Sequence, residues 1–221
     1  MTTQPEWVWL DSVRRGFRLF SRQPVPFVLA TLIYGMAASA LSGAFRYAVG
    51  NLGAFFSFVL AGPCLGGLAL MVREAQEDRP VDLNTAFAPW QRTGDYIVVG
   101  LAITAGVLVL FVGVLVTYTL FMFAPILLAE GHGYAGALAS SRRLVLRHWR
   151  FTLPLAAAVL IGSALGSAIE FSLGLVVVVP VAVAANCVLL DHLRNLATMA
   201  DSSGEAVGAS HARAPREPEG G

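Results

Sequence analysis

The amino-acid sequence predicts an all-α protein, a transmembrane bundle of about six helical spans. Of its 221 residues, 56% are hydrophobic and only 13% are charged, about half the charged share of a typical soluble domain. The mean hydropathy is +0.67. The apolar residues are gathered into long uncharged runs, each long enough to cross a bilayer. We therefore expect lipid rather than water to surround most of the chain.

The first two predicted spans come from the uncharged runs Gln23–Phe45 and Tyr47–Val72. Each run exceeds the roughly 20 apolar residues that a helix needs to cross a hydrocarbon core of about 30 Å. Four Arg lie ahead of the first run, so this segment lacks the apolar core of a signal peptide and we expect the first span to be retained. The spans are placed at about 24–44 and 48–72.

The third uncharged run, Tyr96–Ala129, has 34 residues and as one helix would be about 51 Å long, which is too long for one crossing. If it crosses twice, at about 96–112 and 115–130, all fifteen Arg except Arg46 lie on the side of the N-terminus. A single crossing would leave seven Arg inside and eight outside. The excess of basic residues in cytoplasmic loops favours two crossings.

The last two predicted spans, about 151–167 and 172–190, form a hairpin in an apolar stretch that only Glu170 interrupts. With six spans, both termini lie in the cytoplasm. We expect a protein of bacterial type in the inner membrane. The C-terminal tail is too polar to fold, and we expect it to be disordered. The chain therefore divides into a basic amphipathic interfacial helix (1–23), a six-span membrane domain (24–195) and a cytoplasmic tail (196–221).

An internal repeat is predicted by a shift of 128 positions, which aligns Ser12 with Ser140 and Pro26 with Pro154 among ten identities over 29 positions. The predicted unit is an amphipathic interfacial helix followed by a helical hairpin, used two or three times. A weaker third copy begins at Phe87–Arg92, just before the third span. Repeats of parallel orientation occur in membrane transporters.

The interfacial helices predict a membrane-lipid partner. In the first of them, large apolar side chains recur on one stripe at helical spacing while arginines gather on another. Such a helix lies in the headgroup plane, with guanidinium groups toward lipid phosphate. The alternative is that these arginines only set the topology. The candidate contacts to anionic headgroups are Arg15, Arg18, Arg22, Arg143, Arg147 and Arg150.

Several classes of function are disfavoured. The net charge of +1 lacks the basic excess that a nucleic-acid partner calls for. The spans carry no motif typical of metalloproteases, serine hydrolases or nucleotide-binding proteins. Cys64 and Cys187 lie in apolar runs without a second ligand nearby, so neither a disulfide framework nor a zinc site is indicated. We therefore predict no catalytic residue, cofactor or metal.

Two further features concern how the helices pack. Arg46 and Glu170 occupy corresponding outer turns, and the alternatives are a salt bridge that closes the outer end of the bundle or two independent loop charges. Small residues four positions apart let helices approach closely, within one chain, between two copies, or against a partner membrane protein. The pairs of this kind are Gly62 with Gly66 and Gly162 with Gly166.

The segment Phe123–Arg150 combines a span ending in Ala-Pro, a short turn with Gly131 and Gly133, and a helix with Ser and basic residues that runs to Trp149. This pattern resembles a loose group of bacterial inner-membrane proteins that includes YciC-like proteins and the membrane domain attached to some glycerophosphodiester phosphodiesterases. The resemblance, over roughly residues 10–195, implies a polytopic helical domain without an established activity. No catalytic residue carries over, because the phosphodiesterase site of that relative belongs to a separate soluble domain.

Three functions are consistent with these patterns. The leading hypothesis is a non-catalytic membrane scaffold or accessory component. The alternative is a small transporter or channel for an apolar or lipid-like solute, which needs a continuous cavity lined by residues such as Tyr118, Thr119, Ser163 and Asn186. An intramembrane enzyme would instead need the one local group of ionisable residues to converge. That group is Glu130, His132 and His148, although Glu130 is more typical of a helix end.

Overall fold

The computed structural model describes residues 7–49, 60–104, 110–168 and 173–212, and these ranges hold helices and turns but no strand. The prediction of an all-α protein is confirmed. In chain order the elements are α1 (Val8–Arg22), α2 (Pro24–Val49), α3 (Ala61–Gln76), the 3-10 helix η3 (Leu83–Arg92), α4 (Thr93–Thr104), α5 (Leu110–Phe121), α6 (Ala124–Ala129), α7 (Tyr134–Arg147), α8 (Trp149–Ala168) and α9 (Leu173–Ala212).

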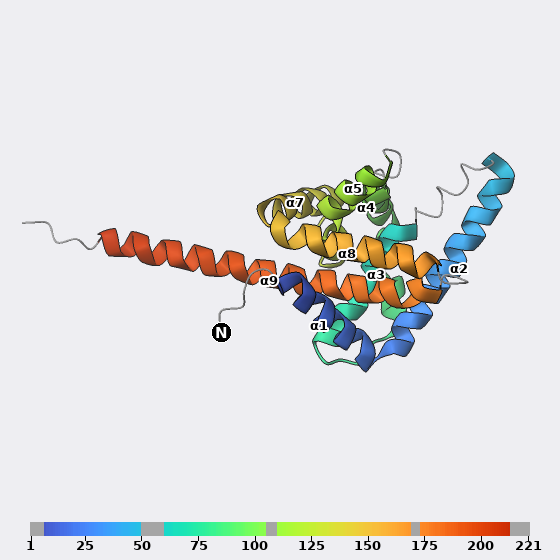
Figure 1. The fold of residues 1–221 in the computed structure, drawn as a ribbon, viewed down its shortest axis with the longest axis horizontal. Helices are drawn as coiled ribbons and strands as arrows, with labels where there is room; N and C mark the ends of the chain where they lie inside the picture. Colours follow the sequence, from blue (N-terminus) through green and yellow to red (C-terminus); the bar gives the residue numbers. More distant parts are fainter. Residues whose placement is uncertain (1–6, 50–59, 105–109, 169–172, 213–221) are drawn as a thin grey trace, which may run out of the picture.

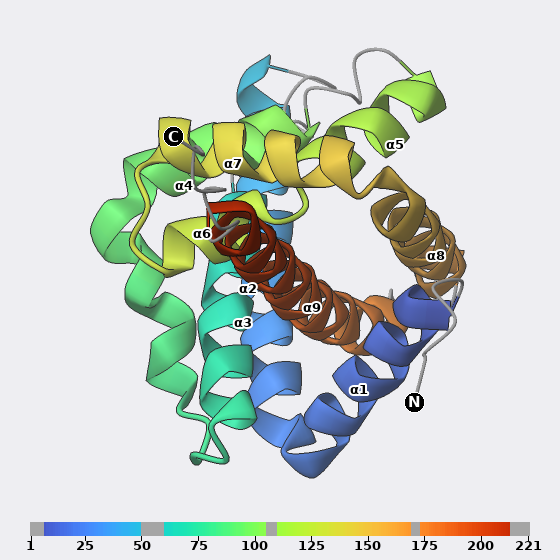
Figure 2. The same cartoon turned by 90° about the vertical axis from the view of Figure 1, so that its left-hand side faces the viewer.

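Helix α9 is the centre of the bundle. Figure 2 views the molecule nearly along α9 and shows the other helices around it. It packs against α1, α8, α3 and α2, and its side chains Leu189, Leu190 and Leu193 are fully buried. Its C-terminal part extends away from the bundle at one end, while α2 leaves it at the other (Figure 1).

Helix α1 is amphipathic, as its sequence pattern indicates. Ser12, Gly16 and Phe20 recur every four residues and are buried, because positions four apart share one face of a helix. This face lies along α9. A Cβ atom at Gly16 would stand 2.7 Å from the backbone nitrogen of Ala185, so the absence of a side chain there sets how closely the two helices approach.

Within the described ranges, fewer helices qualify as membrane spans than the six we predicted. Pro24–Phe45 and Leu175–Met199 are long and apolar enough to cross a bilayer, and α7 with α8, which meet at 108°, add a third if they form one bent span. Helices α4 and α5 have 12 residues each, about 18 Å at 1.5 Å per residue, against a hydrocarbon core of about 30 Å. The described parts of the second, third and fourth predicted spans are therefore too short by themselves.

The uncharged run that we divided into 96–112 and 115–130 is divided differently in the structure. Its described residues form α4, α5 and α6, with a turn at Met122 and Phe123 and Pro125 in the first turn of α6. Proline is favoured at this position because the first helical N–H groups have no partner inside the helix. A charged residue marks the end of an uncharged run, but the charge pattern does not show where a helix ends inside that run.

Three elements that precede an apolar helix pack in a similar way. Helix α1 packs on α9 and α8, η3 packs on α3 and α2, and α7 packs on α6, α5 and α4. In each case the element packs mainly on helices other than the one that directly follows it. The side-chain hydroxyl of Ser141 donates to the carbonyl of Leu120 at 2.8 Å and joins α7 to α5 in this way.

The described residues do not support the repeat at the shift of 128 positions that we predicted. A shift of 128 positions aligns Ser12, which is 2% exposed, with Ser140, which is exposed. A shift of 125 positions instead aligns Phe27 with Thr152 and Ala30 with Leu155, all of which are buried. The buried positions that recur are Phe20, Phe27, Ala30 and Thr31; Pro89, Tyr96, Val99 and Gly100; and Val145, Thr152, Leu155 and Ala156.

Glycine packing gives a first test of this fold. A Cβ atom at Gly62 would lie 1.8 Å from the carbonyl oxygen of Tyr96, whereas one at Gly35 would meet nothing within 4 Å. We expect Gly62→Ala to lower the free energy of unfolding by about 1–3 kcal/mol through overpacking. Gly35→Ala should raise it by up to about 1 kcal/mol through helix propensity. Denaturant titration in mild detergent measures both, and equal effects would contradict the close contact of α3 with α4.

Candidate functional site

Charged residues from three helices meet at one end of the bundle. Arg73 lies in the last turn of α3, Glu130 directly follows α6, and Asp191 and Arg194 are one turn apart on α9. Helix α3 packs against both α6 and α9. The ends of α3 and α6 and an internal turn of α9 are therefore brought together, and we call these four residues with Gln76 the ion-pair network.

Arg73 joins the two carboxylates of the network. Its guanidinium donates to Glu130 Oε1 at 2.6 Å and to Asp191 Oδ2 at 2.7 Å. Arg194 donates to both oxygens of Glu130, at 2.9 and 2.5 Å. This two-pronged arrangement fixes the orientation of a carboxylate as well as holding it, so Glu130 is clamped between α3 and α9.

Gln76 completes the hydrogen bonding. Its side-chain oxygen accepts from Arg73 at 2.8 Å, and its amide donates to Asp191 at 3.2 Å. Since a partly buried polar group without a partner is costly, this amide stabilises the pair it bridges. The hydrogen bonds of the network therefore join α3 to α9, and both helices to the residue that follows α6.

The charges of the network reinforce one another. Burial alone would raise the pKa of Glu130, but its hydrogen bonds and charge interactions with Arg194 and Arg73 bring the pKa below the ordinary 4.5. Burial alone would lower the pKa of Arg73, and its contacts with Asp191 and Glu130 raise it instead. The side chains of Glu130 and Arg73 are each 23% exposed. Both groups are therefore charged at neutral pH, and water screens them only in part.

A polar groove of about 500 Å³ adjoins the network between α1 and α9. Gln76 and Asp191 belong to both. The groove carries both signs of charge, since acidic and basic side chains face each other across it. Its polar lining residues are Asp11, Ser12, Arg15, Arg18, Arg22, Gln76, Asp191, His192 and Asn195.

The arginines predicted to contact lipid headgroups differ in their surroundings. Arg15 pairs with Asp11 at 2.8 Å, and Arg22 pairs with Asp78 at 2.8 Å. Within the described ranges Arg18 forms no ion pair. Two of the three candidates on α1 are thus already neutralised by carboxylates of the protein.

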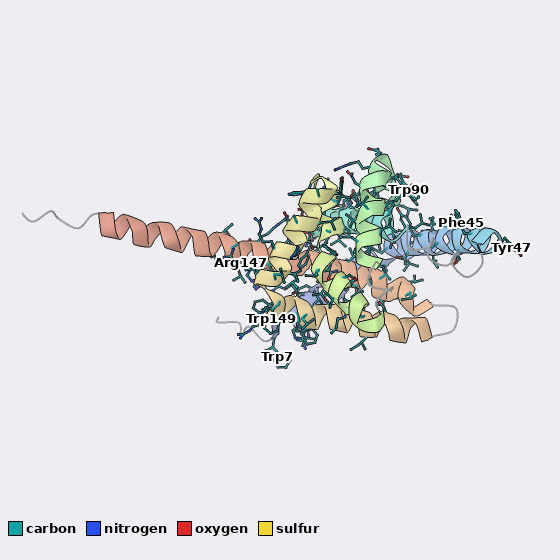
Figure 3. All side chains as sticks on the ribbon, turned by 90° about the horizontal axis from the view of Figure 1, so that it is seen from above. Trp7, Phe45, Tyr47, Trp90, Arg147 and Trp149 are labelled. Carbon is teal, nitrogen blue, oxygen red and sulfur yellow. The ribbon has the colours of Figure 1, made fainter. Side chains whose placement is uncertain are left out.

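The candidates on α7 and α8 lie near a large aromatic side chain. Arg143 and Arg147 are exposed, and the guanidinium of Arg150 lies 5.9 Å from the ring centre of Trp149. Figure 3 shows Trp7, Arg147 and Trp149 at one end of the bundle and Tyr47 at the other. Trp and Tyr concentrate at both membrane–water interfaces, so this separation is the one expected of a bundle that spans a bilayer.

The interior around Tyr118 and Asn186 is filled. The Asn186 amide donates to the Tyr118 hydroxyl at 3.3 Å, and the void beside them measures about 10 Å³, room for about one water molecule. Thr119 donates to the carbonyl of Leu115 at 2.6 Å, and Ser163 does not line the void. Within the described ranges these residues do not form the continuous cavity that the transporter hypothesis needs.

The three ionisable residues considered for an enzyme are engaged separately. Glu130 is held by two arginines, and the Nδ1 atom of His132 lies 2.9 Å from the carbonyl oxygen of Leu127. Burial, followed by the charges of Arg147 and His192, lowers the pKa of His148. In the part of the chain that the structure describes, no group of three or more His, Cys, Asp or Glu is placed to hold a metal ion.

The remaining predicted packing residues are only partly described. Gly66 faces the ring of Tyr96, where a Cβ atom would approach to 2.1 Å, so Tyr96 fits against the Gly62–Gly66 surface. A Cβ atom at Gly162 would make an ordinary contact of 3.6 Å with Val178. Three further residues lie outside what the structure describes: Glu170 entirely, and the surroundings of Arg46 and Gly166.

Sequence reasoning missed Arg73, Asp191 and Arg194. The signal was present, because Arg73, Glu130 and Asp191 are the first charges after three apolar runs, and the predicted topology ends all three runs on the same side. Charges of opposite sign at neighbouring helix ends pair when the helices pack. We interpreted these charges only as span boundaries.

The chain was compared with protein-family models, curated proteins and solved structures, and none of them matches it. The resemblance to YciC-like proteins is therefore untested and stays a prediction. The function has to be argued from the residues of this chain alone.

Removing the charge of Glu130 tests the network. Glu130→Gln leaves Arg194 without its carboxylate and Arg73 with Asp191 alone, so we expect the free energy of unfolding to fall by about 1–3 kcal/mol. Asp11→Asn removes the exposed pair with Arg15 and should cost at most about 0.5 kcal/mol. Denaturant titration compares the two variants. Equal losses would show that the network contributes no more than a surface ion pair.

The pH dependence gives a second test of the same residue. Because the native pKa of Glu130 lies below its ordinary 4.5, the stability it contributes is present above that ordinary value and is lost as the pH falls through the native pKa. The difference in melting temperature between wild type and Glu130→Gln should therefore be constant near neutrality and shrink in acid. A difference that grows as the pH falls would contradict the direction of the shift.

Proposed function

We propose that this chain is an integral protein of the cytoplasmic membrane that acts as a non-catalytic scaffold or accessory component. The observation that carries the proposal is the ion-pair network, in which the charged groups of Arg73, Asp191 and Arg194 pair with Glu130 or with one another and so join helices. The filled interior beside Asn186 supports it too. An enzyme or a transporter keeps polar groups free for a substrate, and charged groups within membrane segments ordinarily mark such sites.

We also propose that the chain crosses the membrane six times with both termini in the cytoplasm. The contacts of Arg73, Glu130 and Asp191 support this, because residues that touch lie on one side of the bilayer. Each follows an apolar segment, so the second, fourth and sixth segments end on a common side. The charge bias of the loops makes that side the cytoplasm.

The six segments form three units in this proposal, each an interfacial helix followed by two apolar segments. Its support is the recurrent packing of α1, η3 and α7 on neighbouring helices. The burial of Phe20, Pro89 and Val145, each seven positions before a buried residue of the following helix, adds to it. Such a burial register continues across the break between the two helices of a unit.

Helix α2 supplies the surface for partners. Only 22% of its most apolar stretch is buried against the rest of the chain, and Val25, Leu29 and Met36 are exposed. A helix with this much exposed apolar surface is surrounded by lipid or by another membrane helix. We propose anionic lipids as the general partner, with a second copy or another membrane protein along α2.

A flux assay separates the scaffold from the transporter alternative. Purified protein in liposomes should move a fluorescent phospholipid between leaflets, or a trapped apolar solute outward, no faster than protein-free liposomes do. The void of about 10 Å³ is far below the size of either. Saturable flux that Asn186→Leu abolishes would overturn the scaffold and establish the transporter.

A further inference from the structure

An apolar groove of about 250 Å³ lies where α1, α8 and α9 meet. Each residue that lines it is apolar, and no charged or amide side chain faces it. On α9 it runs from Val177 to Ala185, a length of about 12 Å at the helical rise. The lining residues are Val13, Phe17, Ala158, Val159, Val177, Val178, Val181, Ala182 and Ala185.

The groove opens toward two arginines. A shallow hollow beside it is lined by Arg14 and Arg18 together with Val13, Phe17 and Val181, and these last three residues also line the groove. The two spaces therefore adjoin each other along α1. Arg14 and Arg18 line the hollow and do not line the groove.

Arg14 and Arg18 are suited to hold an anion. They lie one turn apart on the same face of α1, both are exposed, and across the described ranges neither forms an ion pair. Their neighbours differ, because Arg15 is paired with Asp11 and Arg22 with Asp78. The free guanidinium groups of α1 are the two at the mouth of the groove.

We propose that the groove and the hollow together hold one anionic phospholipid. An acyl chain lies along Val177, Val178 and Ala158, and the phosphate accepts hydrogen bonds from Arg14 and Arg18. The inference rests on the proposed function, since it names a lipid partner for the scaffold. Charge complementarity decides for an anionic lipid over a zwitterionic one, and the apolar groove decides for a lipid over free phosphate.

The larger polar groove between α1 and α9 is less suited to a lipid. Asp11 and Asp191 place negative charge on its walls, and it lacks a continuous apolar surface for an acyl chain. A phosphate there would face carboxylates. Arg18 lines both the polar groove and the hollow, and this contrast is the reason for placing the lipid on the side of Arg14 and Phe17.

Lipid retention tests the cationic end. The protein in detergent micelles is titrated with phosphatidylglycerol, and bound lipid is counted by native mass spectrometry. We expect one saturable site, with Arg14→Ala/Arg18→Ala binding about 30-fold more weakly, since each basic residue near an anionic lipid is worth about 1 kcal/mol. The matched control is Arg79→Ala/Arg142→Ala, which removes the same charge from two exposed positions outside α1 and should leave this site unchanged.

Filling the groove tests the apolar end. Ala158→Phe places a ring in the groove and should also weaken retention of phosphatidylglycerol. Ile161→Phe, on the same helix at a position that is 61% exposed and does not line the groove, should not. Melting temperatures of the variants show whether each is folded.

Three results would overturn the lipid site: equal binding of phosphatidylcholine, no loss in the Arg14 and Arg18 variant, or displacement of the lipid by an equal concentration of inorganic phosphate. A tightly bound partner helix in place of lipid would also overturn it. Failure of the proposed function would give a different experimental result. In that case the wild-type chain itself would be released from membranes by alkaline carbonate, whatever lipid it retains.

Discussion

The contact of Arg73 with two carboxylates is the interaction on which the arrangement of the central helices depends. Glu130 and Asp191 belong to helices that are distant in sequence, and one guanidinium accommodates both. A charge next to an apolar segment is costly without water or a partner, so the ends of α3 and α6 and the turn of α9 that holds Asp191 are stable together and less stable apart. The polar groove on α1 takes its position from Asp191 of the same network.

Close contacts at glycine residues provide a second constraint on how the helices pack. Gly62 and Gly66 receive Tyr96, and Gly16 receives the backbone near Ala185. Association of helices in lipid relies on such close contacts and on hydrogen bonds, because the surrounding lipid tails are as apolar as the helices. The Tyr34 hydroxyl donates to the carbonyl of Ala86 at 2.8 Å, which fixes η3 against α2 in the same manner.

The sequence predicted the helical class, the first span and the amphipathic α1 because these depend on local composition and periodicity. It did not predict where the run after Tyr96 breaks, since an apolar run shows no charge at an internal helix end. The repeat stays a prediction, because the shift of 128 positions aligns buried Ser12 with exposed Ser140, whereas burial aligns Phe27 with Thr152. The ion-pair network required knowing which helix ends meet, and periodicity within one helix carries no such information.

Sidedness is the most direct test of the claim that three apolar segments end together at the cytoplasmic surface. Single cysteines are introduced by Arg79→Cys, His132→Cys and Asn195→Cys, and by Tyr47→Cys at the opposite end, in a chain without its two native cysteines. A membrane-impermeant maleimide should label the first three in inverted membrane vesicles only, and the fourth in intact cells only. Labelling of position 132 or 195 from the outside while position 79 is labelled from the inside would contradict the account.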